Sequence, residues 1–150
     1  MEKLSSVIRT LEYGVIKNSD RMLPSGCLVA IRDRVAELVQ KYEPACAALE
    51  GIIFVQSHRT AITMGAARGA AIIALAERGL QIYEYAPRRV KQSVVGRGGA
   101  AKTQVAFMVR ALLQLTENPP PDAADALAIG LTHFQAHGTA ARGALTLQQI

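Results

Sequence analysis

The chain has few cysteines and no long apolar run. Cys27 and Cys46 are its only cysteines, and two cysteines cannot form the disulfide framework of a small secreted domain. The uninterrupted apolar runs span only a few residues, whereas a membrane-spanning helix needs about 20. The opening segment MEKLSSVIRT has no apolar stretch of signal-peptide length. We therefore expect a reduced, cytoplasmic protein that does not span a membrane.

Acidic residues are missing from one long stretch of the sequence. No Asp or Glu lies between Glu84 and Glu117, and the stretch contains these six basic residues: Arg88, Arg89, Lys91, Arg97, Lys102 and Arg110. The whole chain has 17 Lys and Arg against 12 Asp and Glu, a formal net charge of +5. Concentrated positive charge favours an anionic partner, such as the phosphate backbone of DNA.

The apolar periodicity predicts one α/β domain, in which strands alternate with helices. A chain of 150 residues fits one domain. We expect strands over 6–16, over 45–50 within ACAALEGIIF, and over 81–86. We expect helices over 23–42, 58–78, 87–96, 100–115 and 122–137. Ser25 would cap the start of the first helix, and Gly79 would close the second. We expect GRGG at 96–99 to be a mobile loop and residues 138–150 to be a flexible tail. The domain itself then spans residues 1–137.

Three carboxylates stand in mostly apolar or small-residue surroundings. Glu50 ends a predicted buried strand, where an unpaired charge is costly. Asp122 and Asp125 are three residues apart on a predicted helix, so they project from one face. One interpretation is an oxygen-rich site for Mg²⁺ or Mn²⁺, suited to phosphodiester hydrolysis. The other is that the two aspartates cap the helix and complement its dipole. Spacing alone favours capping, and Glu50 favours the metal site.

Five stretches, which cover most of the chain, resemble the RuvC-type Holliday-junction endonucleases. They are ALEG at 48–51, GAARGAAI at 65–72, YEYAPRRVKQSVVG at 83–96, AKTQVAFMVRALL at 101–113 and PDAADALAIGLTH at 121–133. The resemblance implies an RNase H-like fold with a mixed central sheet flanked by helices. It also implies a homodimer that nicks two opposed strands of a four-way DNA junction, as part of a branch-migration helicase complex. On this basis, the chain would act in DNA recombination and repair.

The resemblance assigns roles to individual residues. Glu50, Asp122 and Asp125 would bind two metal ions, Mg²⁺ or Mn²⁺, and Lys91 and Lys102 would act beside the scissile phosphate. The DNA-contacting set would be Phe54, Arg88, Arg89, Lys91, Arg97, Lys102 and Arg110. Phe54 lies in the loop expected to stack on junction bases, although the aromatic typical of the family falls at the position of Ile53. Packing of Phe54 against its own domain is the alternative.

The predicted helix that begins at His58 is rich in small residues. Nine of the sixteen residues from Ala61 to Ala76 are Gly or Ala, which allows another backbone to approach closely. The resemblance implies a two-fold dimer contact there, involving Gly65, Arg68 and Gly69. Ordinary packing against the sheet is the alternative. For the three histidines, we expect His133 to lie too far from the metals to be a ligand, and His58 and His137 to be surface residues.

One motif of the family is missing from this sequence. The family has a further catalytic aspartate in an Asp-Pro-Gly segment on its first strand, and no such segment occurs here. We therefore expect the first two strands of the family fold to be missing, through a start codon placed too late. Two alternatives to a junction endonuclease remain: a truncated paralogue that only binds junctions, and a nuclease that cuts RNA–DNA hybrids.

Overall fold

The computed structural model describes residues 1–4, 7–52 and 57–140. Contacts between backbone positions divide these residues into two units. The first unit contains residues 1–4, 7–15, 48–51 and 83–140, and the second contains residues 16–47, 52 and 57–82. None of the described helices is long and apolar enough to cross a membrane.

The first unit begins with a short antiparallel strand pair. Strand β1 (Glu2–Leu4) pairs with β2 (Val7–Arg9), and Glu2 stands opposite Arg9 in the register. The single strand expected over residues 6–16 is therefore wrong beyond Arg9, because residues 10–16 form no strand. The side chains of Leu11 and Val15 alternate as expected but remain 36% and 40% exposed. The alternation of apolar residues alone is therefore not enough to form a strand over residues 10–16.

A second strand pair carries one of the predicted site residues. Strand β3 (Cys46–Glu50) pairs with β4 (Gln81–Tyr85). The sequence predicted a strand at each of these two positions. The Gly51 N–H donates to the Tyr85 carbonyl at 2.9 Å, so the carboxyl ends of the two strands lie side by side. The expected mixed central sheet is not observed, because the strands of the described residues form two separate two-stranded sheets.

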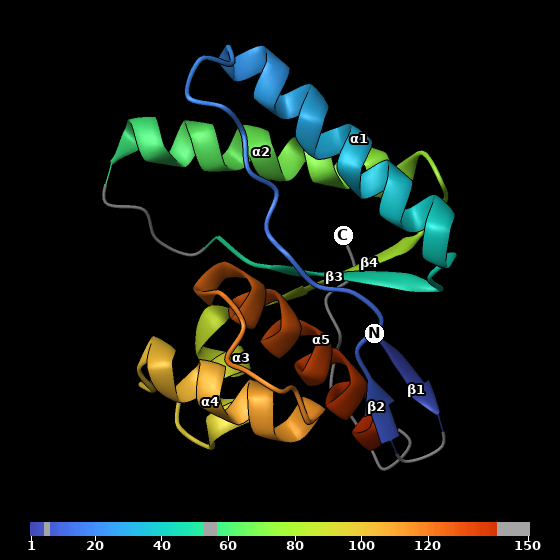
Figure 1. The fold of residues 1–150 in the computed structure, drawn as a ribbon, viewed down its shortest axis with the longest axis vertical. Helices are drawn as coiled ribbons and strands as arrows, with labels where there is room; N and C mark the ends of the chain where they lie inside the picture. Colours follow the sequence, from blue (N-terminus) through green and yellow to red (C-terminus); the bar gives the residue numbers. More distant parts are fainter. Residues whose placement is uncertain (5–6, 53–56, 141–150) are drawn as a thin grey trace. The chain divides into compact units, whose positions relative to one another are not determined.

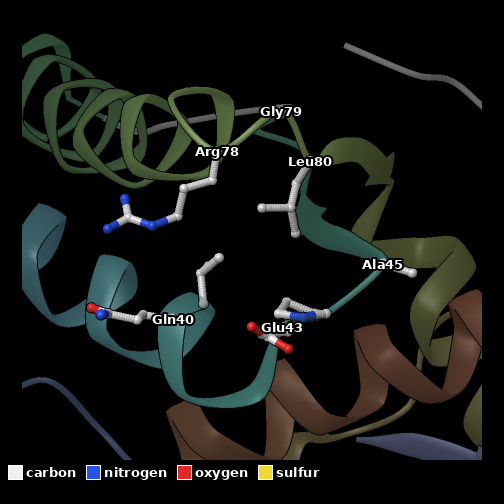
Figure 2. A pocket seen from close by; sticks show the side chains of 8 residues that line it. Gln40, Glu43, Ala45, Arg78, Gly79 and Leu80 are labelled. Carbon is white, nitrogen blue, oxygen red and sulfur yellow. The ribbon is translucent and has the colours of Figure 1, made fainter.

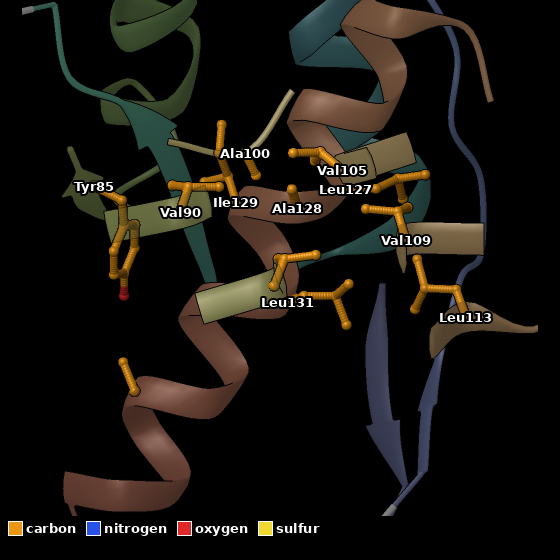
Figure 3. Packing of buried hydrophobic residues seen from close by; sticks show 12 residues of the cluster. Tyr85, Val90, Ala100, Val105, Val109, Leu113, Leu127, Ala128, Ile129 and Leu131 are labelled. Atoms are coloured by element: carbon orange, nitrogen blue, oxygen red, sulfur yellow. The ribbon is translucent and has the colours of Figure 1, made fainter. Parts of the chain in front are cut away.

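Three helices build the core of the first unit (Figure 1). Helices α3 (Pro87–Val95), α4 (Lys102–Leu113) and α5 (Pro121–Ala140) pack against one another. Figure 3 shows the buried side chains that meet between them. Each helix contributes apolar residues four positions apart, which lie on one face: Val90 and Val94, Val105 and Val109, and Leu127 and Leu131. The predicted amphipathic helices are thus confirmed.

The second unit contains a pair of long helices. Helix α1 (Pro24–Tyr42) packs along α2 (His58–Ala76) (Figure 1). The Ser25 cap is wrong: the helix already begins at Pro24, and Leu23 precedes it without a side-chain cap bond. Proline suits this first position because its fixed φ is helical and its missing N–H is not needed there. The glycine stop of α2 is confirmed, since Gly79 has a φ of 67° and its N–H bonds to the Ala76 carbonyl.

Some smaller expectations need correction. Helix α5 continues to Ala140, so Gly138 does not begin a tail, and residues 141–150 lie outside the described residues. Cys27 and Cys46 are both half-buried, and neither forms a disulfide. Partial burial raises the pKa of the Cys46 thiol. His58 and His137 are exposed, as predicted.

Candidate active site

Glu50 lies at the carboxyl end of β3, beside the carboxyl end of β4. The next residue, Gly51, is fixed by its backbone bond to Tyr85. The missing side chain at Gly51 leaves room for a neighbouring carboxyl group, because a Cβ there would stand 2.8 Å from Glu84 Oε1. Pairing with β4 thus holds the backbone at Glu50 while its carboxylate remains at the exposed strand end.

The electrostatic surroundings of Glu50 bring together four of the five predicted catalytic residues. Partial burial, and then the negative charge of Asp125, raise the pKa of Glu50. The positive charges of Lys102 and Lys91 act in the opposite direction. Lys102 Nζ also lies 3.7 Å from Asp125 Oδ2. We call Glu50, Asp125, Lys91 and Lys102 the carboxylate–lysine cluster, and all four belong to the first unit.

Asp122 is less closely associated with this cluster. It lies in the first turn of α5, one turn before Asp125, and it is exposed whereas Asp125 is half-buried. It is not among the charges that shift the pKa of Glu50. An acid in a first turn complements the helix dipole, so the interpretation of Asp122 as a helix-stabilising residue stays open.

The site fits a divalent cation in part. Among the described residues, no three His, Cys, Asp or Glu side chains already converge as a set of metal ligands. The negative charge of Asp125 nevertheless raises the pKa of Glu50, because the two carboxylates repel each other when both are ionised. A hard cation bound between two carboxylates removes such a repulsion, and oxygen ligands suit Mg²⁺ and Mn²⁺. These two residues are therefore the better-supported ligands.

The predicted DNA-contacting arginines lie on the same unit as the carboxylates. Arg88 and Arg97 are exposed, and Arg89 and Arg110 are half-buried. The two half-buried guanidinium groups stack on rings, Arg89 at 5.4 Å from the Tyr85 centroid and Arg110 at 5.3 Å from the Phe107 centroid. Stacking of this kind orders a long side chain while leaving donors for a phosphate.

The remaining predicted residues lie elsewhere. Phe54 falls outside the described residues. Gly65, Arg68 and Gly69 are on α2 in the second unit. Among the residues that the structure describes, a Cβ added at Gly65 or Gly69 would meet no atom within 4 Å, so their packing does not require glycine at either position.

The structure also reveals residues that the sequence interpretation left without a role. His133 is 7% exposed and hydrogen-bonded to Tyr85, between Nδ1 and the phenolic oxygen, at 2.8 Å. The signal in the sequence was the match of two spacings, tyrosines two apart in a strand and histidines four apart in a helix.

A cavity in the second unit contains none of the predicted site residues. Its volume is about 590 Å³, and it is lined by Val39, Gln40, Glu43, Pro44, Ala45, Arg78, Gly79 and Leu80. Figure 2 shows Arg78 and Leu80 on one side of the opening, and Gln40 and Glu43 on the other. The candidate chemistry is therefore at an exposed strand end and not in this cavity.

Comparisons with known proteins agree on one family. The family model described as crossover junction endodeoxyribonuclease RuvC matches residues 1–133. A protein of that name from Akkermansia muciniphila is 61% identical over 126 residues, which cover 84% of this chain and 75% of the relative. Another from Edwardsiella ictaluri is 43% identical over 148 residues, covering 89% and 86%.

Solved structures give the same result. The structure described as T. thermophilus RuvC in complex with Holliday junction substrate matches with a TM-score of 0.89 at 35% identity. The match covers 100% of this chain and 88% of that chain. A structure described as Thermus thermophilus RuvC has a TM-score of 0.80 at the same identity. Together with the α/β content, these matches show that the chain has a RuvC-like fold.

Proposed function

Because the chain belongs to the family of RuvC crossover junction endodeoxyribonucleases, we propose that it cleaves Holliday junctions in DNA with the help of Mg²⁺. The observation that carries this proposal is the carboxylate–lysine cluster. It combines two mutually repelling carboxylates, Glu50 and Asp125, with two cations in a single unit. Carboxylates suit a divalent metal and lysines suit a phosphate, so the cluster has both parts that metal-assisted phosphodiester hydrolysis needs.

The roles of the residues follow from their positions. Glu50 and Asp125, with Asp122 one turn earlier, would hold the metal ions. When bound, two divalent ions supply an activated water and stabilise the leaving oxygen. Lys102 lies beside Asp125, with its Nζ 3.7 Å from Asp125 Oδ2. In addition, Lys91 and Lys102 would attract the scissile phosphate and stabilise the charge that develops on it.

Arginine side chains would hold the rest of the junction. Arg88, Arg89, Arg97 and Arg110 belong to the acid-free stretch, and backbone contacts from such residues position DNA without reading its sequence. Phe54 would stack on an unpaired base. These contacts would give affinity for the shape of the junction, and cleavage would depend on the carboxylates.

The direct test is cleavage of a synthetic four-way junction, with linear duplex and RNA–DNA hybrid of the same sequence as controls. We expect symmetric nicks in the junction with Mg²⁺, none with EDTA, and little cutting of either control. Junction binding without nicking would favour the alternative of a catalytically impaired binding protein. The missing Asp-Pro-Gly segment and the absence of a three-ligand cluster within residues 1–4, 7–52 and 57–140 are the observations that favour this alternative. Equal cutting of hybrid and junction would contradict junction specificity.

Symmetric nicking also requires two active sites. We propose that α2 forms a two-fold contact through the face that bears Gly65 and Gly69, where Ile62 and Ile73 are 73% and 52% exposed. Arg68 on the same helix would contribute to the contact. The expected result is a dimer in sedimentation equilibrium that Gly69→Leu converts to monomer. Gly14→Leu is the control, because a Cβ at Gly14 also meets no atom of the described residues within 4 Å. A monomeric wild-type chain would contradict the dimer.

We also propose that this chain contacts a branch-migration helicase.

A further inference from the structure

Four rings meet where α5 packs on β4. Tyr83 and Tyr85 are two residues apart on the strand, and His133 and His137 are four apart on the helix, so each pair lies on one face. The His133 ring centroid lies 4.9 Å from that of Tyr83, 5.9 Å from that of Tyr85 and 4.2 Å from that of His137. We call these four residues the ring cluster. It joins helix and strand within the first unit.

One directional bond fixes this packing. The Tyr85 hydroxyl and His133 Nδ1 are 2.8 Å apart, and the two residues are only 1% and 7% exposed. Burial, and then the neighbouring His137, lower the pKa of His133 to about 4. The ring is therefore neutral at pH 7 and has one nitrogen that donates and one that accepts. Ring packing alone allows sliding, whereas a buried hydrogen bond does not.

Tyr85 is also bound to the strand end that carries Glu50. Its carbonyl accepts the N–H of Gly51 at 2.9 Å, directly after Glu50. A single residue is thus hydrogen-bonded through its backbone to Gly51, directly after β3, and through its side chain to α5. His133 follows Asp125 by eight residues on α5, about 12 Å along the helix axis, and a slip of one residue would move Asp125 by about 1.5 Å.

We propose that Tyr85 and His133 are positioning residues, which fix the register of α5 against the β3–β4 pair and so hold the Asp125 carboxylate beside Glu50. This inference rests on the proposed metal-dependent function. Neither residue touches a reacting atom. Their contribution is to keep two carboxylates at the spacing that a divalent ion requires.

The test uses the full chain and the variant Tyr85→Phe, which retains the ring and removes the hydroxyl. We expect its affinity for Mn²⁺ in calorimetry to fall about tenfold, the lower end of the range for a group that orients a metal ligand. Its kcat on the junction should fall by a similar factor, with KM unchanged. Amide hydrogen exchange, measured without metal, should become faster in peptides covering 46–51 and 121–126.

Thr132→Val is the matched control. The Thr132 side chain is in the same helix, is 2% exposed, and donates a buried hydrogen bond to the Ala128 carbonyl at 2.8 Å. Its removal costs a buried hydrogen bond whose two partners both belong to α5. We expect this variant to lose thermal stability but to bind Mn²⁺ within about twofold of wild type.

The outcomes separate cleanly. Unchanged Mn²⁺ affinity in Tyr85→Phe, or equal losses in both variants, would overturn the positioning role. If the wild type neither binds Mn²⁺ nor cuts the junction, the proposed function fails. The positioning role is then decided by amide hydrogen exchange. Exchange must become faster in both peptides, 46–51 and 121–126, in Tyr85→Phe, and must stay unchanged in both peptides in Thr132→Val. Should Tyr85→Phe not fold, His133→Gln is measured in its place, with the same expectations.

Discussion

The two units use their charged residues differently. In the first unit, Glu50 and Asp125 lie close enough for the charge of one to raise the pKa of the other, and two lysines act on the same carboxylate. In the second unit, two ion pairs on α1 join neighbours in sequence, Arg32 with Asp33 at 2.7 Å and Arg34 with Glu37 at 3.0 Å. Local surface pairs of that kind contribute little. By contrast, like charges that the fold brings together indicate a ligand-binding site.

The largest difference between the units should appear in catalysis. Asp125→Asn removes one of the proposed ligands and should lower kcat on the junction by about a thousandfold, or about 4 kcal/mol of transition-state stabilisation. Junction affinity in a binding assay should change little. Asp33→Asn, which removes an ion-paired aspartate from the second unit, should keep kcat within about twofold. Undiminished cutting by Asp125→Asn would exclude that residue from the mechanism.

The units should also differ in how strongly a core valine stabilises them. Val109 is fully buried at 0% exposure, so Val109→Ala should lower the free energy of unfolding by about 2 kcal/mol. Val39→Ala should cost about 1 kcal/mol, because Val39 lines the cavity of the second unit and lacks partner atoms on that side. Urea unfolding checks both values. A larger loss for Val39→Ala would contradict this account of the packing.

A third comparison concerns pH. The folded pKa of His133 is lowered to about 4 from 6.5, so between these values the unfolded chain binds a proton that the native chain does not. The contribution of His133 to the free energy of unfolding is thus fully present above pH 6.5. It is lost as the pH falls towards 4, by at most about 1.4 kcal/mol per pH unit. Urea unfolding at several pH values should show this slope.

The matched variants for the pH slope are both histidine replacements. His133→Gln should flatten the slope, because it removes the buried group that titrates. His58→Gln removes an exposed histidine of the second unit and should keep the wild-type slope. A slope that survives in His133→Gln would mean that another group causes it.

The smallest effect is on Glu50 itself. In the metal-free protein, Asp125→Asn should lower the pKa of Glu50 because it removes a negative neighbour, and Lys102→Gln should raise it because it removes a positive one. Carboxyl carbon NMR over a pH titration measures both shifts. The control Lys41→Gln, on α1 of the second unit, should leave the titration unchanged. Shifts of the opposite sign would show that these charges do not face Glu50.

Local sequence signals predicted most of the helices and the two longer strands. Apolar residues four apart in 90–94, 105–109 and 127–131 predicted amphipathic helices, and Gly79 predicted the end of α2. The predictions failed where they depended on partners that a local pattern does not contain. Residues 10–16 alternate like a strand but form none, and Ser25 is displaced as a cap because Pro24 begins the helix one residue earlier.

The candidate site was predictable in its residue types but not in its arrangement. Glu50 at a strand end and the Asp122–Asp125 spacing indicated carboxylate chemistry. The sequence could not distinguish Asp125, which is half-buried and raises the pKa of Glu50, from Asp122, which is exposed, because both are on one helix face. It also left His133 without a role, since its partner Tyr85 lies 48 residues away.

The sequence by itself determined the family, the element order and the concentration of positive charge over residues 85–116, because each of these depends on residue identity and local spacing. Only the tertiary structure decided that Glu50 and Asp125 lie within electrostatic reach and that Tyr85 is bonded both to Gly51 and to His133. These contacts join residues far apart in the chain. They exist only after burial of the helix faces has brought β3, β4 and α5 together. A local sequence pattern shows which face of a helix is buried, but it does not show which element covers that face.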